Sequence, residues 1–210
     1  MDAFVIYIQG HEDSEMFSDR CVQSIIDTKS HLDVQKFPAI TPENMWQVNY
    51  TWPLRKKSTC PKTGLLLSAY KTYDNNKRIA AAQSHYMLWR KCVTINKPIL
   101  ILEHDAIFIK QFDSNILEWW PGEGAISINN PIGATFSSKE YDAKLSNGIN
   151  EVPWLVSEDT PQGLPGHSAY VIYPDAAKEV MQLQEEVGWW PNDAIMCKQL
   201  CPWIRCYKPY

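Results

Sequence analysis

The feature of the sequence that most constrains the fold is a short aliphatic run, Pro98–Leu102, which ends in the charged triplet Glu103-His104-Asp105. Strands that helices cover on both faces carry such continuous apolar runs, whereas strands with one wet face alternate apolar and polar residues. The run is far shorter than the roughly 20 residues of a membrane-spanning helix. We therefore expect a buried strand of a mainly parallel sheet, with the triplet at its carboxyl end.

Strand-like and helix-like patterns alternate along the rest of the chain. This alternation predicts an α/β fold, with one domain built on a mainly parallel central sheet flanked by helices. The expected strands are 3–8, 34–37, 98–102, 124–128 and 169–172, and the expected helices are 14–28, 42–48, 79–96 and 174–187, with Asn192 capping a final short helix. Periodicity fails in 49–77 and through most of 129–166, and we expect loops there.

Charge and cysteine usage narrow the class of protein. The net charge of −4 argues against a large electrostatic footprint on nucleic acid or anionic lipid, and favours small-molecule or glycan substrates. The first residues lack the basic, apolar and small-residue segments of a secretory signal, so we expect a cytoplasmic protein, in the host cytoplasm if the chain is viral. The six cysteines are then expected to be free thiols.

The acidic triplet follows its strand at the place where open α/β sheets bind ligands. If the chain remains extended there, Glu103 and Asp105 project to one side and His104 to the other. Two carboxylates that face one point suit Mg²⁺ or Mn²⁺, which take oxygen ligands and usually bind substrate phosphates as well. The alternative is that both carboxylates only solvate a turn.

Five separated segments carry further motifs in a fixed order: Ile79–Trp89 with a Ser-His pair and a Trp, Pro98–Ala106, Gly166–Ile172, Ala176–Lys178, and Pro191–Asp193. Together they resemble glycosyltransferase family 25, which includes lipopolysaccharide galactosyltransferases and the catalytic domains of collagen galactosyltransferases. The likeness covers residues 79–200 in spaced islands. Two places differ from the family pattern. His104 replaces its middle acidic residue, and Gln9-Gly10-His11-Glu12 replaces its Arg-containing segment after the first strand.

The resemblance implies a single glycosyltransferase domain of the GT-A type over residues 1–210. Residues 1–128 are expected mainly to bind the nucleotide sugar and the metal, and residues 129–210 mainly to supply the acceptor side and the catalytic base. The implied reaction moves a hexose, with inversion, from a nucleotide diphosphate sugar such as a UDP-sugar to a hydroxyl of a glycan or lipopolysaccharide-like acceptor. It needs positive charge against the departing diphosphate and a base for the acceptor proton.

For the metal and the base, we expect Asp105 to be the principal metal ligand, with Glu103 assisting. His167, in a turn before a strand, is a candidate third ligand, and its alternative is a solvent-facing loop histidine. Asp193 matches the family's late acidic position and is the expected catalytic base. Its alternative is an ordinary first-turn residue of a helix.

The remaining candidates concern the two substrates. Trp189 and Trp190 are expected to form a sugar-stacking platform for the acceptor, with core packing as the alternative. Arginine suits bidentate contacts with phosphate, which makes Arg78 a donor-site candidate. A buried histidine satisfied by backbone groups is the alternative for His85. The full set of expected donor-binding residues is Gln9, Gly10, Arg78, Ser84, His85 and His104.

Two other functions remain open at this point. A glycosyltransferase with the same chemistry could act on a modified DNA base, and its activity would then fall steeply with salt. A catalytically silent nucleotide-sugar-binding module is the second alternative, motivated by His104 and by the altered first loop. Such a module would bind donor without turnover.

Overall fold

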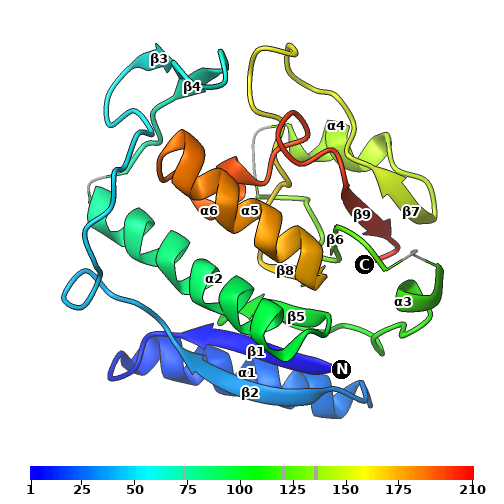
Figure 1. The fold of residues 1–210 in the computed structure, drawn as a ribbon. Helices are drawn as coiled ribbons and strands as arrows, with labels where there is room; N and C mark the ends of the chain where they lie inside the picture. The colour runs from blue at the N-terminus through cyan, green and yellow to red at the C-terminus, as the bar shows by residue number, and fades with distance from the viewer. Residues whose placement is uncertain (73, 120–121, 135–136) are drawn as a thin grey trace.

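A seven-stranded sheet forms the centre of the computed structural model, which describes residues 1–72, 74–119, 122–134 and 137–210. The strand order is β2-β1-β5-β8-β6-β9-β7 (Figure 1). The strands are β1 (Asp2–Tyr7), β2 (Asp33–Pro38), β5 (Ile99–Glu103), β6 (Ala125–Ser127), β7 (Gly148–Glu151), β8 (Ala169–Ile172) and β9 (Ile204–Lys208). β2, β1, β5, β6 and β9 point one way, and β8 and β7 run against them. The predicted mainly parallel α/β sheet is confirmed.

Helices cover both faces of this sheet. α1 (Glu12–Asp27) packs on one face, where Cys21 and Ile25 meet Val5 and Leu102. α2 (Asn75–Ile95) and α5 (Pro174–Val187) pack on the other face, against residues such as Ile101. β5 is buried on both sides, which explains its uninterrupted aliphatic sequence. The short helices are α3 (Ile116–Trp119), α4 (Ser138–Ala143) and α6 (Asn192–Ile195).

The elements predicted from strong periodicity are present within a few residues of their expected bounds, and β8 and α5 match them at both ends. α6 begins one residue earlier than expected, because Pro191 is its N-cap and Asn192 is its first residue. The buried side of α2 is also broader than an apolar stripe, since it includes the polar side chains of Gln83, Ser84 and His85.

The helix expected over residues 42–48 is wrong. Only a turn forms at 42–44, and its backbone groups find partners elsewhere. Gln83 of α2 donates to the carbonyl of Trp46 (2.6 Å) and accepts from the Trp46 amide (3.2 Å), while the Asn44 side chain accepts from the Thr41 amide (2.7 Å). These side-chain bonds compete with the helical hydrogen bonds that the segment would need.

Other differences lie where no regular element was expected. A two-stranded hairpin, β3 (Lys57–Thr59) with β4 (Leu66–Ser68), forms within 49–77. α4 and β7 form within 129–166, and β9 completes the sheet near the C-terminus. Residue 73 and residues 135–136 of these expected loops lie outside the described residues.

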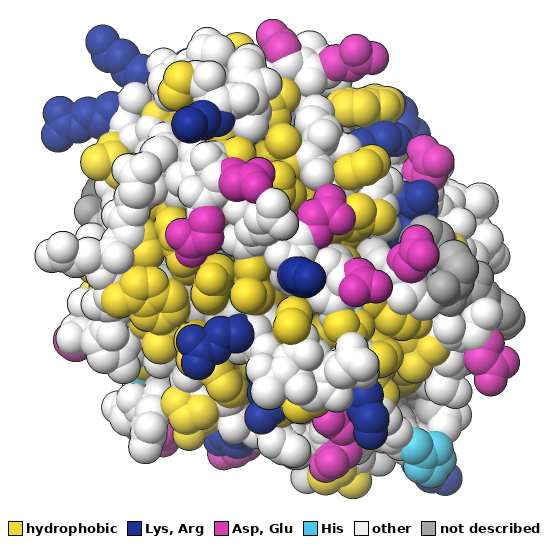
Figure 2. All heavy atoms as spheres, in the orientation of Figure 1, with side chains coloured by type: hydrophobic (Ala, Val, Ile, Leu, Met, Phe, Trp, Pro, Cys, Tyr) yellow, Lys and Arg dark blue, Asp and Glu magenta, His cyan; other side chains and the backbone are white. Residues whose placement is uncertain are grey.

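The surface and the cysteines agree with the expectations from composition. Acidic and basic side chains are interspersed on the face of the molecule that α2 and α5 cover (Figure 2). All six cysteines are free and buried. Within the described part of the chain, no helix is both long and apolar enough to cross a bilayer.

Candidate active site

The acidic triplet lies at the carboxyl end of β5, but it is not extended. β5 ends at Glu103, and His104 and Asp105 form a turn closed by a hydrogen bond from the Ala106 amide to the Glu103 carbonyl (3.0 Å). The alternation that was expected to bring both carboxylates to one side is therefore wrong, because it holds only for a strand. Glu103 lies towards α2, within 3.5 Å of His85 Nε2. Asp105 is exposed on the turn. It lies near enough to α1 that its charge adds to the effect of burial in raising the pKa of Cys21.

A chain of buried side chains leads to Glu103 from the core. Trp89 Nε1 donates to the Tyr170 hydroxyl (2.9 Å), which lies 2.8 Å from His85 Nδ1. Burial raises the pKa of Tyr170 well above its usual value, so this hydroxyl keeps its proton and can donate it to Nδ1. With Nδ1 as the acceptor, Nε2 is the ring nitrogen that carries a proton, and it lies near the carboxylate of Glu103. His85 is thus satisfied by side chains rather than by the backbone groups of the alternative.

His167 lies beside this chain, and the solvent-facing alternative for it is wrong. Its ring is 1% exposed and stacks on the ring of Tyr170, with centroids 4.2 Å apart. Neither ring nitrogen has a hydrogen-bond partner among the described residues. Burial, and then the proximity of His85, lowers the pKa of His167 well below its ordinary value. The ring is therefore neutral, with two unpaired nitrogens, which is the form in which histidine binds a metal or accepts a proton.

Asp193 is the second residue of the short helix α6 and faces the same region as Glu103. Burial raises the pKa of its carboxyl above the ordinary value, and the charge of Glu103 acts in the same direction. A hydrogen bond from the Tyr70 hydroxyl and the positive charge of Arg78 oppose this rise. A carboxyl whose pKa is raised by burial is a stronger base than an ordinary surface aspartate, which suits it to accept a proton. Asp193 therefore differs from an ordinary first-turn aspartate.

The segment 49–72 closes over Asp193 with aromatic side chains. The guanidinium carbon of Arg78 lies 4.0 Å from the centroid of the Tyr70 ring, and Tyr70 stacks on Trp52 at 5.4 Å. Tyr50 Oη and Arg78 Nε are buried, with no hydrogen-bond partner in the described part of the chain. Buried polar atoms are rarely left unpaired in native structures, so these atoms mark a place where a ligand or water is expected.

The candidates at the end of β1 lie at the same edge of the sheet, since β1 and β5 are parallel neighbours. Gln9 and Gly10 are exposed, and the Gly10 amide donates to Glu15 (2.8 Å). His104 Nδ1 lies 3.0 Å from Ser14 Oγ, so His104 faces α1 and not the side of Glu103. The turn after β1 and the turn after β5 are therefore joined through Ser14.

Three other candidates have structural contacts. Ser84 accepts from the Ile40 amide (2.8 Å) and donates to the Ala80 carbonyl (2.9 Å), which fastens the chain after β2 to α2. Trp189 and Trp190 are 3% and 0% exposed, and Trp190 donates to Thr51 (2.9 Å). This burial agrees with the packing alternative for the two tryptophans. Donor or acceptor binding by these residues stays a prediction.

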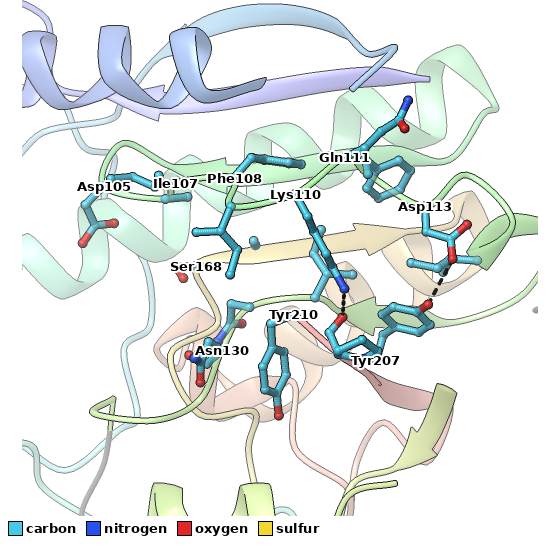
Figure 3. A pocket seen from close by; sticks show the side chains of 18 residues that line it. Asp105, Ile107, Phe108, Lys110, Gln111, Asp113, Asn130, Ser168, Tyr207 and Tyr210 are labelled. Carbon is cyan, nitrogen blue, oxygen red and sulfur yellow. Dashed lines mark hydrogen bonds between the residues drawn. The ribbon is translucent and has the colours of Figure 1, made fainter. Parts of the chain in front are cut away.

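A cavity of about 300 Å³ opens next to the triplet (Figure 3). It is lined by the segment after β5, from Asp105 to Asp113, and by residues at the ends of β6, β8 and β9. Asp105 lies at one end of it in this view. Glu103, His85, His167 and Asp193 are not among its lining residues, so the cavity and the polar cluster are separate features that meet at the end of β5.

The donors available for a cation are the carboxylates of Glu103 and Asp105, with the unpaired ring nitrogens of His167 as a further candidate. No group of three or more His, Cys, Asp or Glu side chains among the described residues is arranged to hold a metal by itself. Mg²⁺ and Mn²⁺ do not require such a cage, because one or two carboxylates plus substrate phosphates and water complete their coordination. Asp105, exposed on its turn, and Glu103, whose side chain is 40% exposed, fit this limited requirement.

The structure brings Glu103, His85, His167, Arg78 and Asp193 to one region from α2, α6 and the ends of β5 and β8. Sequence reasoning missed the tyrosines of this region, Tyr50 and Tyr70, which lie in a segment without periodicity. Tyr170 was part of a recognised strand, but its sequence gave no sign that its hydroxyl would join Trp89 to His85.

Comparison with known proteins gives one family. A model of glycosyltransferase family 25, described as an LPS biosynthesis protein, matches residues 15–196. That range contains the end of β5, His167 and Asp193, whereas β1 and the turn at Gln9-Gly10 precede it. No curated protein matches the chain in a sequence search. Since the family model covers most of its length, the chain belongs to glycosyltransferase family 25.

Proposed function

We propose that this glycosyltransferase transfers a hexose from a nucleotide diphosphate sugar to a hydroxyl of a glycan or lipopolysaccharide-like acceptor, with Asp193 as the base. The observation that carries the proposal is the environment of Asp193. Its carboxyl is partly desolvated, lies in the field of Glu103 and accepts a hydrogen bond from Tyr70, next to buried donors that have no partner among the described residues.

The chemistry asked of the protein is limited. The acceptor oxygen forms a bond to the anomeric carbon as the bond from that carbon to the diphosphate breaks, and the acceptor proton passes to Asp193. Arg78 is suited to hold the diphosphate, because guanidinium donates two parallel hydrogen bonds to phosphate oxygens. Its unpaired Nε is one such donor. We infer that Gln9 and Gly10 contact the nucleotide from the adjacent strand end.

Metal dependence is part of the proposal. Asp105 and Glu103 would hold Mn²⁺ or Mg²⁺, and His167 is a further candidate ligand because its ring nitrogens are unpaired. The cation, when bound, supplies positive charge against the departing diphosphate. His85 contributes through Glu103, since its Nε2 lies 3.5 Å from Glu103 Oε1 and fixes the direction of that carboxylate.

The test incubates the protein with a panel of nucleotide sugars, with Mn²⁺, with Mg²⁺ and with chelator, and measures nucleotide release with and without glycan acceptors. Asp193→Asn should lower transfer by roughly 10²–10⁴-fold, the usual contribution of a general base. Asp175→Asn is the matched control, because Asp175 is an exposed first-turn aspartate of α5. Transfer by Asp193→Asn at the parental rate would exclude the base, and metal-independent turnover would exclude the cation.

A further inference from the structure

Apart from Asp105, the residues that line the cavity beside the triplet have no part in the proposed transfer chemistry. The cavity lies between the segment after β5 and the end of β9, where Tyr207 contributes a ring to its lining (Figure 3). Ser168 lines it, whereas the adjacent His167 stacks with His85 on the α2 side. The cavity therefore opens at the edge of the sheet where Glu103 and Asp105 lie. It lies on one side of β8, and His85 lies on the other.

Its lining combines aromatic rings with small polar groups. Phe108, Tyr207 and Tyr210 supply apolar surface. Ser168 supplies a hydroxyl, and Asn130 supplies an amide whose oxygen already accepts from the Ile132 amide (2.9 Å), which leaves its NH₂ group for a ligand. A sugar ring needs both kinds of partner, because its C–H faces pack on apolar surface while its hydroxyls must remain hydrogen-bonded when water is displaced.

The charges around the cavity indicate a neutral ligand. Asp105 and Asp113 both line it, and Asp113 accepts a hydrogen bond from the Tyr207 hydroxyl (3.0 Å). The ammonium group of Lys110 is already engaged, since it donates to the Pro209 carbonyl (2.6 Å; Figure 3). An anionic sugar would therefore meet two carboxylates against one ammonium group, and the excess negative charge would repel it.

The volume sets the size of the ligand. About 300 Å³ is at the lower limit of small-molecule sites, which span roughly 300–1,000 Å³. This suits one sugar ring rather than an entire nucleotide sugar. The buried rings of Trp189 and Trp190 offer no comparable open face, since they are 3% and 0% exposed.

We propose that this cavity binds one neutral sugar ring of the acceptor, with Ser168 and Asn130 as hydrogen-bond partners and Tyr207 and Tyr210 as packing surface. The inference rests on the proposed function in calling the sugar an acceptor. Binding itself does not depend on transfer, so the two can be tested apart.

The experiment measures binding of neutral methyl glycosides and of N-acetylneuraminate to the full chain by ligand-observed NMR, without donor or metal. Ser168→Leu fills the cavity and should abolish neutral-sugar binding, with at least a tenfold rise in Kd. Asn130→Ala removes one hydrogen bond at an exposed position and should weaken binding about fivefold. The control is Gln182→Ala, an exposed amide on α5 outside the cavity. Urea unfolding of each variant checks that the fold is retained.

Three outcomes separate the inference from the proposed function. The inference is supported if the parent binds neutral sugars but not the acidic sugar, and if Ser168→Leu and Asn130→Ala weaken that binding. This holds even if no nucleotide is ever released. The inference is overturned if the protein binds no neutral sugar, or if the Ser168→Leu variant binds it as well as the parent does. Metal-dependent nucleotide release by the same protein would then leave the proposed function in place. Preferential binding of N-acetylneuraminate contradicts the charge argument and also overturns the inference.

Discussion

Replacing Tyr70 with phenylalanine should move the acid limb of the pH profile of transfer to higher pH. The Tyr70 hydroxyl donates a hydrogen bond to Asp193, and this bond lowers the pKa of a carboxyl that burial raises. Hydrogen bonds to charged groups are worth about 1.5–3 kcal/mol, and one pKa unit corresponds to about 1.4 kcal/mol. Because Asp193 is only partly buried and water can replace part of the bond, we take the lower limit, which predicts a rise of about one unit.

The consequence for the rate depends on pH. Well below both pKa values, Tyr70→Phe should transfer about tenfold more slowly than the parent, and well above them the two rates should converge. The ring is kept, so its stacking on Trp52 and its contact with Arg78 should persist. The assay is kcat/KM for transfer across the acid range, together with urea unfolding of both proteins.

Tyr50→Phe is the matched control. It removes the same atom from a neighbouring tyrosine whose hydroxyl is buried, with no hydrogen-bond partner among the described residues. Its acid limb should coincide with that of the parent. Coincident limbs for Tyr70→Phe and the parent, or a shift to lower pH, would refute the assignment of Asp193 as a base tuned by Tyr70.

The remaining predictions concern stability, each measured by urea unfolding. Tyr170→Phe leaves Trp89 Nε1 and His85 Nδ1 unpaired in the core and should lower the free energy of unfolding by about 2–4 kcal/mol; a loss under 0.5 kcal/mol would contradict the hydrogen-bond chain. Gly188→Ala should cost more than Gly64→Ala, because both glycines have positive φ (86° and 76°) but only the new Cβ at 188 would lie 2.2 Å from Thr51 Cγ2. His167→Phe should gain stability relative to the parent as pH falls from 8 to 5. The folded pKa of His167 is lowered, so the parent loses stability below the unfolded pKa of about 6.5, by at most about 2 kcal/mol at pH 5. An equal difference at both pH values would show that His167 titrates normally.

Much of the fold could be predicted because burial leaves a strong local pattern. β5 and β8 lie in the middle of the sheet with helices on both faces, so their apolar runs are continuous, and α5 has an apolar stripe that ends in Gly188. β9 was missed, although its sequence Ile204-Arg-Cys-Tyr-Lys208 partly alternates, because the segment is short and its alternation is incomplete. The helix predicted over 42–48 does not form because Gln83, a distant residue, binds the backbone of Trp46.

Some residues of the candidate site could also be chosen from the sequence, but their surroundings could not. Motif order identified Glu103 and Asp193, the chemistry of phosphate binding suggested Arg78, and the structure brings the three together. The exact end of β5 was not predictable, since nothing local to the triplet distinguishes a strand that ends at Glu103 from one that continues to Asp105. The tyrosines that surround Asp193 come from a segment whose position is set only by tertiary contacts, such as the hydrogen bond from Thr51 to the Val187 carbonyl (3.0 Å).

The reversed direction of β8 has a consequence for engineering this enzyme. Because β8 runs against β5, its first residues arrive at the edge where the carboxyl ends of β5 and β6 lie. One connecting segment, residues 152–166, therefore delivers His167 to one side of the sheet and Ser168 to the other. Exchanging that segment between related chains would re-aim both side chains at once without replacing any residue of β5 or α6, provided that Gly163, which packs against the Asp193 carbonyl, is kept. It is the natural place to begin a loop-grafting library for altered sugar choice.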